Sequence, residues 1–376
     1  MDGIKRNILL NPGPGTTTDS VKMAMVVSDI CPREQEFTEI VRRIRIDLVQ
    51  IAGGDNNFTA ILFSGSGTAV VDAVINSVVP PKGKLAVIVN GAYGERMFRI
   101  AQAYGIPCVV IGFTFGTRID AGQVRKILEE DKEISCLAIV HHETTTGILN
   151  QVQEIGEICK ANGRVFIVDA ISSYAGIPLN VRECGIDFML STSNKCIQGM
   201  AGIAFVVAGK AALEEIKVYP KRSFYLDLYS QFSGLETTGQ FQFTPPVQVV
   251  YALREAIRDF FAEGAEGRQK RYAENYAVLK AGLHEIGFRF LLRTEDESGI
   301  LMTVLEPDDE RYDFSRMHDY LYEAGFTIYP GKLSQSRTFR LAVMGDIYPD
   351  DIREFLSRLK DFIRMEGLRI KYHEGE

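Results

Sequence analysis

Two short apolar runs in the middle of the sequence each lead to a polar side chain that could take part in chemistry. The run at 165–169 ends in Asp169, and the run that begins at Phe188 leads to Lys195. Such runs are typical of buried parallel strands, whose carboxyl ends meet at one edge of a sheet. A lysine amine can bind an aldehyde, and a carboxylate can keep a ring nitrogen protonated. We therefore expect Lys195 and Asp169 to hold pyridoxal phosphate.

Lysines and aspartates follow strands in most α/β proteins, because the loops there are exposed to solvent. The assignment of this pair to a cofactor therefore needs further evidence from the rest of the chain. The elements that would position the pair are recognisable. Apolar strands alternate with helical stretches through the first 210 residues, a rhythm that predicts a mostly parallel, doubly wound sheet. We expect strands at 59–63, 85–89, 108–111, 136–140 and 165–169, one that begins at 188 and leads to Lys195, and, at the sheet edge, one at 202–207. Helices are expected at 37–52, 69–79, 121–130 and 153–161, whereas 219–244 reads as irregular.

The pattern changes after an amphipathic helix expected at 247–263 and two further helical segments that reach about residue 286. We then expect strands at 288–292, 300–305 and 338–343, with helices at 314–324 and 350–365. Short strands interspersed with helices after a long connecting helix indicate a separate α+β domain. The expected organisation is a large domain of residues 16–265 and a small domain of residues 1–15 and 266–376.

Composition narrows the range of functions. The 376 residues carry a net charge of −7, and their basic residues are scattered, which argues against a general affinity for nucleic acid or anionic membranes. The six cysteines show no CxxC spacing, so neither a zinc site nor a disulfide framework is expected. No apolar signal core or membrane-length run is present. We expect a cytoplasmic protein.

A glycine turn at 64–68 falls between an expected strand and an expected helix. The start of a helix offers free N–H groups and a partial positive charge, and glycine lets a phosphate approach them. The turn lacks the Gly-Lys-Ser/Thr ending of a P-loop, and Val70 occupies the third glycine position of the dinucleotide fingerprint. A phosphate cup and a plain strand–helix turn both remain open.

Three other features could serve a ligand. Tyr93, flanked by glycines after a strand, could stack on a planar ligand or fill core. The adjacent His141, His142 and Glu143 suggest a metal, but successive side chains of an extended chain point to opposite sides and no third ligand has suitable spacing, so no metal is expected. Arg340 interrupts an apolar strand and could face solvent or an anion between the domains.

Taken together, these motifs resemble the class V aminotransferases, a family of fold-type I pyridoxal phosphate enzymes. The matching motifs span nearly the whole chain. They are Asn11-Pro-Gly-Pro-Gly15, Ser64-Gly-Ser-Gly-Thr68, Asn90-Gly-Ala-Tyr93-Gly94, His142-Glu-Thr-Thr-Thr-Gly147, Val168-Asp169-Ala170, Ser193-Asn-Lys195, Thr244-Pro-Pro246 and Phe339-Arg340-Leu341. The resemblance implies a large doubly wound α/β domain that binds the cofactor and a smaller α+β domain.

The resemblance also implies a role for each matching residue. Lys195 would bind the cofactor as a Schiff base and act as the base, and Asp169 would partner the pyridinium nitrogen. Other positions would contact the cofactor phosphate, ring or 3-oxygen: Ser66, Gly67, Thr68, Tyr93, Thr144 and Thr244. Thr244 would reach the phosphate from the neighbouring subunit of a homodimer. Phe241 stands where alanine:glyoxylate enzymes have a phosphate-holding tyrosine, so that hydroxyl contact is missing here.

For the substrate, Arg340 matches the arginine that clamps the carboxylate of the amino or keto acid. Within the family the resemblance is strongest to the branch that moves the amine of 2-aminoethylphosphonate to pyruvate, and alanine:glyoxylate or serine:pyruvate exchange is next. Arg33 is a second candidate for substrate binding, although the family usually has His-Arg in that stretch. Arg337 is a further candidate, with a surface role as the alternative.

Two other functions remain as alternatives. A desulfurase or lyase of the same cofactor family would use a mobile cysteine, and Cys196 directly follows the lysine, where packing is the simpler role. A non-catalytic nucleotide-binding protein could use the turn at 64–68, and such a protein would be colourless.

Overall fold

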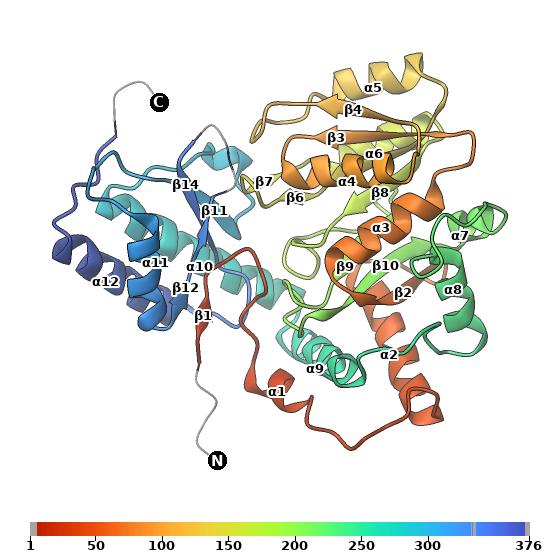
Figure 1. Ribbon diagram of the computed structural model, residues 1–376, viewed down its shortest axis with the longest axis horizontal. Helices are drawn as coiled ribbons and strands as arrows, with labels where there is room; N and C mark the ends of the chain where they lie inside the picture. Colours follow the sequence, from red (N-terminus) through yellow and green to blue (C-terminus); the bar gives the residue numbers. More distant parts are fainter. Residues whose placement is uncertain (1–5, 332, 334–335, 373–376) are drawn as a thin grey trace.

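The computed structural model describes residues 6–331, 333 and 336–372 of the chain. Residues 1–5, 332, 334–335 and 373–376, all of them assigned above to the small domain, lie outside the described residues. Figure 1 shows a larger lobe built around a sheet and a smaller lobe that contains most of the C-terminal residues together with the first strand.

The larger lobe contains a seven-stranded sheet in which β10 is antiparallel to both its neighbours and the other neighbouring pairs are parallel. In order across the sheet, the strands are β2 (Phe58–Gly65), β10 (Gly202–Gly209), β9 (Phe188–Thr192), β8 (Val165–Asp169), β5 (Ile134–Val140), β3 (Lys84–Val89) and β4 (Cys108–Gly112). The expected α/β sheet is therefore confirmed. The expected edge position of 202–207 is wrong, because β2 pairs along the full length of β10. The run Ile203 to Ala208 is buried on both faces, as suits an interior strand.

Helices connect these strands and cover the sheet (Figure 1). They are α1 (Asp19–Met23), α2 (Gln35–Ile51), α3 (Gly67–Val78), α4 (Ala92–Ala103), α5 (Ala121–Glu130), α6 (Val152–Ala161), α7 (Lys210–Ile216), α8 (Leu228–Thr237) and α9 (Val247–Glu263). Helix α8 contradicts the irregular structure expected across 219–244. The Asp227 side chain caps α8 by accepting from the Ser230 N–H, and Leu228, Phe232 and Leu235 bury one face of the helix.

The smaller lobe contains a three-stranded antiparallel sheet of order β11-β14-β13 and a two-stranded parallel pairing of β1 with β12. Its elements are β1 (Ile8–Leu9), α10 (Ala265–Ile286), a 3-10 turn (Thr294–Asp296), β11 (Leu301–Leu305), α11 (Phe314–Glu323), β12 (Phe326–Thr327), β13 (Tyr329–Pro330), β14 (Thr338–Ala342) and α12 (Pro349–Met365). Two short strands, β6 (His142–Glu143) and β7 (Ile148–Leu149), pair with each other in the larger lobe.

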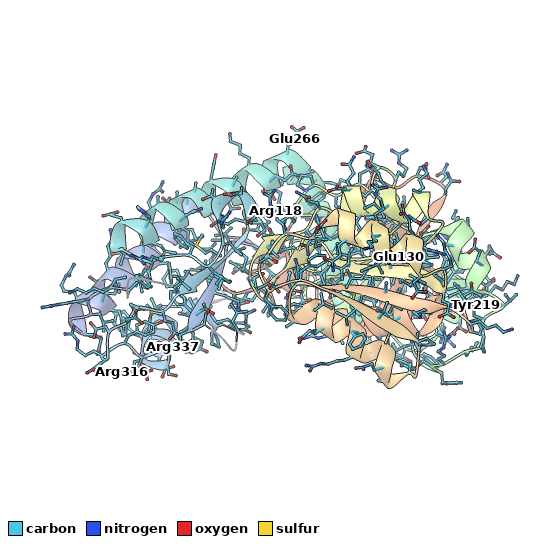
Figure 2. The ribbon with its side chains drawn as sticks, turned by 90° about the horizontal axis from the view of Figure 1, so that it is seen from above. Arg118, Glu130, Tyr219, Glu266, Arg316 and Arg337 are labelled. Carbon is cyan, nitrogen blue, oxygen red and sulfur yellow. The ribbon has the colours of Figure 1, made fainter. Side chains whose placement is uncertain are left out.

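Two expectations for this lobe are wrong. The segment 288–292 forms only an isolated bridge from Phe290 to Val304 rather than a strand, and Phe288 packs edge-on against Phe339. The two helical segments expected before residue 286 are one continuous helix, α10, which begins after Gly264 at a φ of +77°. Figure 2 shows α10 extending along the smaller lobe from the junction of the lobes, near Glu266.

The buried hydrophobic side chains form two main clusters. One surrounds the seven-stranded sheet and contains residues between 37 and 260, and the other joins residues 8 and 10 to residues between 272 and 368. Cys196 belongs to the second cluster, so the residue directly after Lys195 packs against the smaller lobe, whereas Ile197 packs in the first cluster. We therefore propose domain boundaries near residues 15 and 265. None of the described helices is long and apolar enough to cross a membrane.

Candidate active site

Asp169 and Lys195 come from neighbouring strands, as the sequence pattern indicated. Asp169 is the last residue of β8, and it pairs in parallel register with Leu190 of β9. Lys195 follows three residues after β9 ends, and the two side chains lie close enough for each to shift the pKa of the other. A carboxyl group and an amine therefore share the carboxyl edge of the sheet, where open α/β folds bind ligands.

The amine of Lys195 is held by the N-terminal segment of the chain. Its Nζ donates a hydrogen bond of 2.5 Å to the carbonyl oxygen of Pro12. A Cβ atom on Gly13, which has a φ of +118°, would lie 2.0 Å from that Nζ, so the position accepts only glycine. Desolvation lowers the pKa of Lys195, and the charge of Arg340 lowers it further. Burial in the site thus makes the neutral, nucleophilic form of the amine easier to reach than it is in water.

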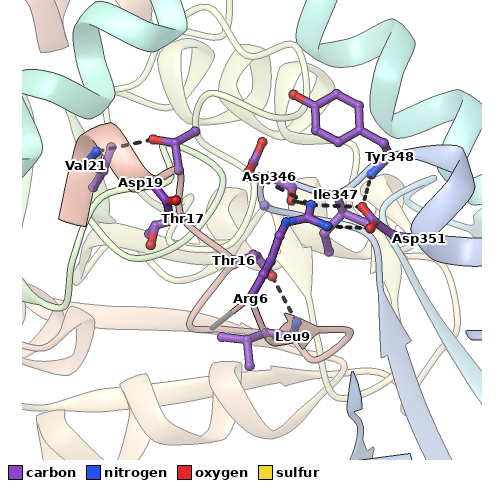
Figure 3. Close-up of polar contacts among 12 residues, drawn as sticks. Arg6, Leu9, Thr16, Thr17, Asp19, Val21, Asp346, Ile347, Tyr348 and Asp351 are labelled. Carbon is purple, nitrogen blue, oxygen red and sulfur yellow. Dashed lines mark hydrogen bonds and ion pairs between the residues drawn. The ribbon is translucent and has the colours of Figure 1, made fainter. Parts of the chain in front are cut away.

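The N-terminal segment is itself fastened at several points. The Gly15 N–H donates to the carbonyl oxygen of Asn194, directly before the lysine. Figure 3 shows the Thr16 hydroxyl accepting from the Leu9 N–H, and Arg6 beside the start of α12 within the smaller lobe. There Arg6 donates to the Asp351 carboxylate and to the backbone carbonyl of residue 346. These contacts hold the Pro12 carbonyl against the lysine.

The residue after the lysine is anchored from α10. Arg268, which is 1% exposed, donates to the Cys196 carbonyl at 3.0 Å and to Glu263 at 2.8 Å, and Tyr272 reaches the same carbonyl at 3.4 Å. The Cys196 thiol faces the Ser172 carbonyl, and burial raises its pKa to about 12. A buried, protonated thiol is a packing group, so the structure gives no support to Cys196 as the mobile nucleophile of a desulfurase.

Asp169 is buried, with 5% of its surface exposed, and its Oδ1 accepts from the Ile171 N–H at 2.9 Å. Burial raises the pKa of this carboxyl to about 7, with Glu143 raising it further and Arg96 and Lys195 opposing the shift. A carboxyl group so far from its ordinary pKa lacks a sufficient cationic partner. A protonated ring nitrogen would supply the missing positive charge.

We expect the Asp169→Asn substitution to stabilise the cofactor-free protein at pH 8 and not at pH 4. Because the folded-state pKa is raised, Asp169 costs no stability below its unfolded pKa near 4; the cost grows between pH 4 and 7 and is constant above about 7. The gain in free energy of unfolding at pH 8 should be on the order of 4 kcal/mol. Urea unfolding of both proteins at the two pH values measures it, and a difference that does not change with pH contradicts this account.

The start of α3 offers a place for an anion. Ser66 is the exposed N-cap residue, and its side chain makes no capping hydrogen bond, so the first N–H groups of this 12-residue helix lack a side-chain partner there. A Cβ on Gly67 would approach the Ile171 side chain to 2.8 Å, which places this turn beside the residues that follow Asp169. Thr68 Oγ1 accepts from Arg96 at 3.2 Å.

Tyr93 lies in the first turn of α4, and Glu143 fixes that turn. The Glu143 carboxylate accepts from the backbone N–H groups of Tyr93 and Gly94 at 3.1 and 3.3 Å, and from the Thr145 hydroxyl at 2.5 Å. A Cβ on Gly91 would lie 2.1 Å from Glu143 Cγ, so the close approach requires glycine. Glu143 thus acts as the anion at the positive end of a helix, a role that the sequence analysis missed.

The two histidines beside Glu143 have other partners. His141 and His142 form hydrogen bonds through Nδ1 to the hydroxyls of Ser173 and Ser172 at 2.9 and 3.0 Å. Burial lowers the pKa of the two rings to about 4 and about 3, so both are neutral at pH 7. Among residues 6–331, 333 and 336–372, no group of three His, Cys, Asp or Glu side chains is placed to hold a metal ion.

Arg340 crosses from the smaller lobe to the larger one. It is 1% exposed on β14, and its guanidinium donates to the carbonyl oxygens of Pro330 and Thr144, each at 3.1 Å. Burial lowers the pKa of Arg340, and a side-chain hydrogen bond with Tyr93 acts in the opposite direction. The buried cation therefore lies beside the tyrosine and close to Lys195, where an anionic ligand would meet it.

Two predicted residues lie apart from this cluster in the single chain. Arg33 is exposed and donates to Gln240 Oε1 and to the Phe241 carbonyl, both at 2.9 Å. Thr244 is exposed just before α9. Neither has a contact with Lys195 or Arg340 in the part of the chain that the structure describes. Their predicted roles require a second subunit.

Arg96 is the functional candidate that the sequence analysis overlooked. Its Cζ lies 4.7 Å from the centroid of the Tyr93 ring, and it donates to Thr68. The sequence could have predicted this contact. Residues three apart on a helix lie on the same face, and Arg96 follows Tyr93 by three positions.

The chain is similar to known proteins over most of its length. The family model for Aminotransferase class-V matches residues 20–334. A 2-aminoethylphosphonate–pyruvate transaminase of Phocaeicola vulgatus is 43% identical over 94% of this chain and 98% of its own, and one of Syntrophobacter fumaroxidans is 41% identical over 96% and 97%. A bifunctional phosphonoacetaldehyde hydrolase/aminoethylphosphonate transaminase of Clostridioides difficile is 39% identical over 95% of this chain and 56% of its own.

Among solved structures, an alanine–glyoxylate aminotransferase from Nostoc sp. superposes with a TM-score of 0.89 at 26% identity and covers 96% of both chains. A ureidoglycine–glyoxylate aminotransferase from Bacillus subtilis has the same TM-score at 24% identity, over 99% of this chain and 96% of its own. The second likeness bears on the fold alone.

Proposed function

The chain belongs to the class V aminotransferases, and we propose that it transfers the amine of 2-aminoethylphosphonate to pyruvate, producing phosphonoacetaldehyde and alanine. The observation that carries this assignment is the identity of 41–43%, over nearly the full length, with transaminases named for that reaction. The bifunctional relative supports it, because its name joins the transaminase to a hydrolase of the aldehyde that the transfer would produce.

We propose pyridoxal phosphate as the cofactor, and the residues present fit it. The amine of Lys195, the buried Asp169 carboxyl that lacks a cationic partner, and the free start of α3 match its aldehyde, ring nitrogen and phosphate. When bound, the cofactor supplies an aldehyde for the substrate amine and a ring that takes up the electrons released at the substrate carbon. Ser66, Gly67, Thr68, Tyr93 and Thr144 would complete its contacts.

Three side chains of this protein would then have different roles in the reaction. Lys195, with its lowered pKa, can hold a proton taken from the substrate carbon and deliver it again within reach of Nζ. Asp169 would keep the ring nitrogen of the bound cofactor protonated, which an asparagine could not do. Arg340 binds the anionic end of the substrate. Its planar fork suits both a phosphonate and the carboxylate of pyruvate, so one residue can serve both halves of the reaction.

We also propose a homodimer, in which Thr244 contributes to the partner's phosphate site and Arg33 to substrate binding. Exposed aromatic side chains beside Thr244 support it, since Phe224 is 82% and Tyr225 46% exposed, and Tyr225 stacks on Phe243 at 4.9 Å. Light scattering should then give twice the chain mass of 42.0 kDa. A cytoplasmic location remains part of the proposal, from the cysteine pattern.

The test of the substrate is a comparison of amine donors with pyruvate as acceptor. Alanine formed from 2-aminoethylphosphonate is compared with alanine formed from β-alanine, which has a carboxylate in place of the phosphonate. The proposal predicts a much higher kcat/KM for the phosphonate. If the protein transfers the amine of alanine to glyoxylate but ignores 2-aminoethylphosphonate, the substrate assignment is wrong and the alternative within the family, alanine:glyoxylate or serine:pyruvate exchange, replaces it.

A further inference from the structure

Arg96 connects the proposed phosphate site to the proposed ring platform. From the second turn of α4, its guanidinium donates to Thr68 Oγ1 at the start of α3 and lies 4.7 Å from the centroid of the Tyr93 ring. Its charge also lowers the pKa of Asp169. One side chain is thus close to three of the residues that would hold the cofactor.

The phosphate site needs a positive charge that its own residues do not carry. Ser66, Gly67 and Thr68 are neutral, and the helix dipole of α3 amounts to about half an elementary charge. A phosphate monoester carries about −1.5 to −2 charges at pH 7. Arg96 is the cation in contact with this turn, and its planar group presents several N–H donors.

The electrostatic partners of Arg96 differ from those of its helix neighbour. Arg99 forms an ion pair with Glu95 on the exposed side of α4. Arg96 has no carboxylate partner within 4.0 Å among the residues that the structure describes, and it contacts a hydroxyl and an aromatic ring instead. A partly buried guanidinium without a carboxylate partner is available to an anion.

We propose that Arg96 is a positioning and charge-balancing residue for the cofactor phosphate, an inference that rests on the proposed use of pyridoxal phosphate. By donating to Thr68 Oγ1, it leaves the hydroxyl proton of Thr68 free to donate to a phosphate oxygen. Its own charge compensates that of the phosphate. Its guanidinium over the Tyr93 ring would hold that ring in place through a cation–π contact.

The experiment compares cofactor-free wild type with Arg96→Gln, Arg96→Lys and, as the matched control on the same helix, Arg99→Gln. Dissociation constants are measured by absorbance titration for pyridoxal phosphate and for pyridoxal, which lacks the phosphate. The R96Q variant should bind pyridoxal phosphate about 10- to 100-fold more weakly than wild type, because the phosphate loses the compensating charge and the Thr68 hydroxyl loses the donor that orients it. Its affinity for pyridoxal should change less than about threefold, which also shows that the ring site remains folded.

The other two variants separate the effect of the Arg96 charge from that of its planar geometry and from a general effect of α4. R96K should fall between wild type and R96Q, because it keeps the charge and loses the planar fork, and R99Q should match wild type for both ligands. Equal weakening of both ligands in R96Q would overturn the proposal in favour of a purely structural role. Unchanged affinity for pyridoxal phosphate would overturn it as well. Failure of the wild type to bind pyridoxal phosphate would instead remove the proposed function on which the inference rests.

Discussion

The Lys195→Ala variant should lose transamination by at least about 10⁴-fold, because one substitution removes both the amine that binds the cofactor and the base that moves the proton. Lys195→Met is the matched variant that keeps most of the side-chain volume while also removing the amine. Both should be inactive in a single-turnover assay with 2-aminoethylphosphonate. Transamination near the wild-type rate in either variant would contradict the assignment of Lys195.

The loss of activity should not be accompanied by loss of the fold. Because desolvation lowers the pKa of Lys195, the folded chain disfavours the ammonium form that dominates in the unfolded chain at pH 7. Removing this group therefore removes an electrostatic cost. The melting temperature of cofactor-free Lys195→Met should equal or exceed that of cofactor-free wild type, and a lower value would mean that the amine stabilises the fold through its contact with Pro12.

Replacement of Arg340 should have the second largest effect. Arg340→Lys keeps a charge but loses the fork that can bind phosphonate and carboxylate through two parallel hydrogen bonds, so kcat/KM for both 2-aminoethylphosphonate and pyruvate should fall by about 10³-fold. Most of the change should appear as a raised KM, since the residue binds the anion rather than the reacting carbon.

Arg337 provides the matched control for Arg340. It lies three residues earlier in the chain, its side chain is 69% exposed, and it pairs with Glu306 on the surface. Arg337→Gln should leave both kinetic constants unchanged, because the charged group of Arg337 pairs with Glu306 and not with the residues of the candidate site. If folded Arg340→Lys retains wild-type kcat/KM, or if Arg337→Gln has the larger effect, the substrate anion binds elsewhere.

Local sequence patterns were sufficient to predict that Asp169 and Lys195 lie near each other. Asp169 and Lys195 follow short apolar runs, which predict buried strands, and neighbouring parallel strands bring such residues together. The position of Arg340 was likewise visible, since a charged residue inside an apolar strand requires either solvent or a partner. The class V motifs then distinguished these residues from ordinary loop residues.

The errors came from contacts between distant parts of the chain. Strand β10 lies inside the sheet because β2, more than 130 residues earlier, pairs along its outer side. The 288–292 segment alternates like a strand, but only the packing of the smaller lobe decides that it stays a single bridge. Helix α8 depends on a cap at Asp227 within a stretch whose aromatic composition suggested loops.

The residues that hold Lys195 and Cys196 in place could not be predicted either, because they too come from distant parts of the chain. The Pro12 carbonyl meets Nζ across 183 residues of chain, and no periodicity in a Pro-Gly segment encodes where it folds back. Arg268 is an ordinary helix residue in the sequence, and only the packing of α10 against the loop after β9 makes it a buried anchor for Cys196.

The most direct test of the account is borohydride reduction of the purified protein, followed by proteolysis and mass spectrometry of the peptides. The account predicts that the visible absorbance of the cofactor disappears on reduction and that a single peptide, the one containing Lys195, carries the mass of the reduced pyridoxal phosphate group. A cofactor group on a different lysine, or a reduced protein with no modified peptide, would contradict it.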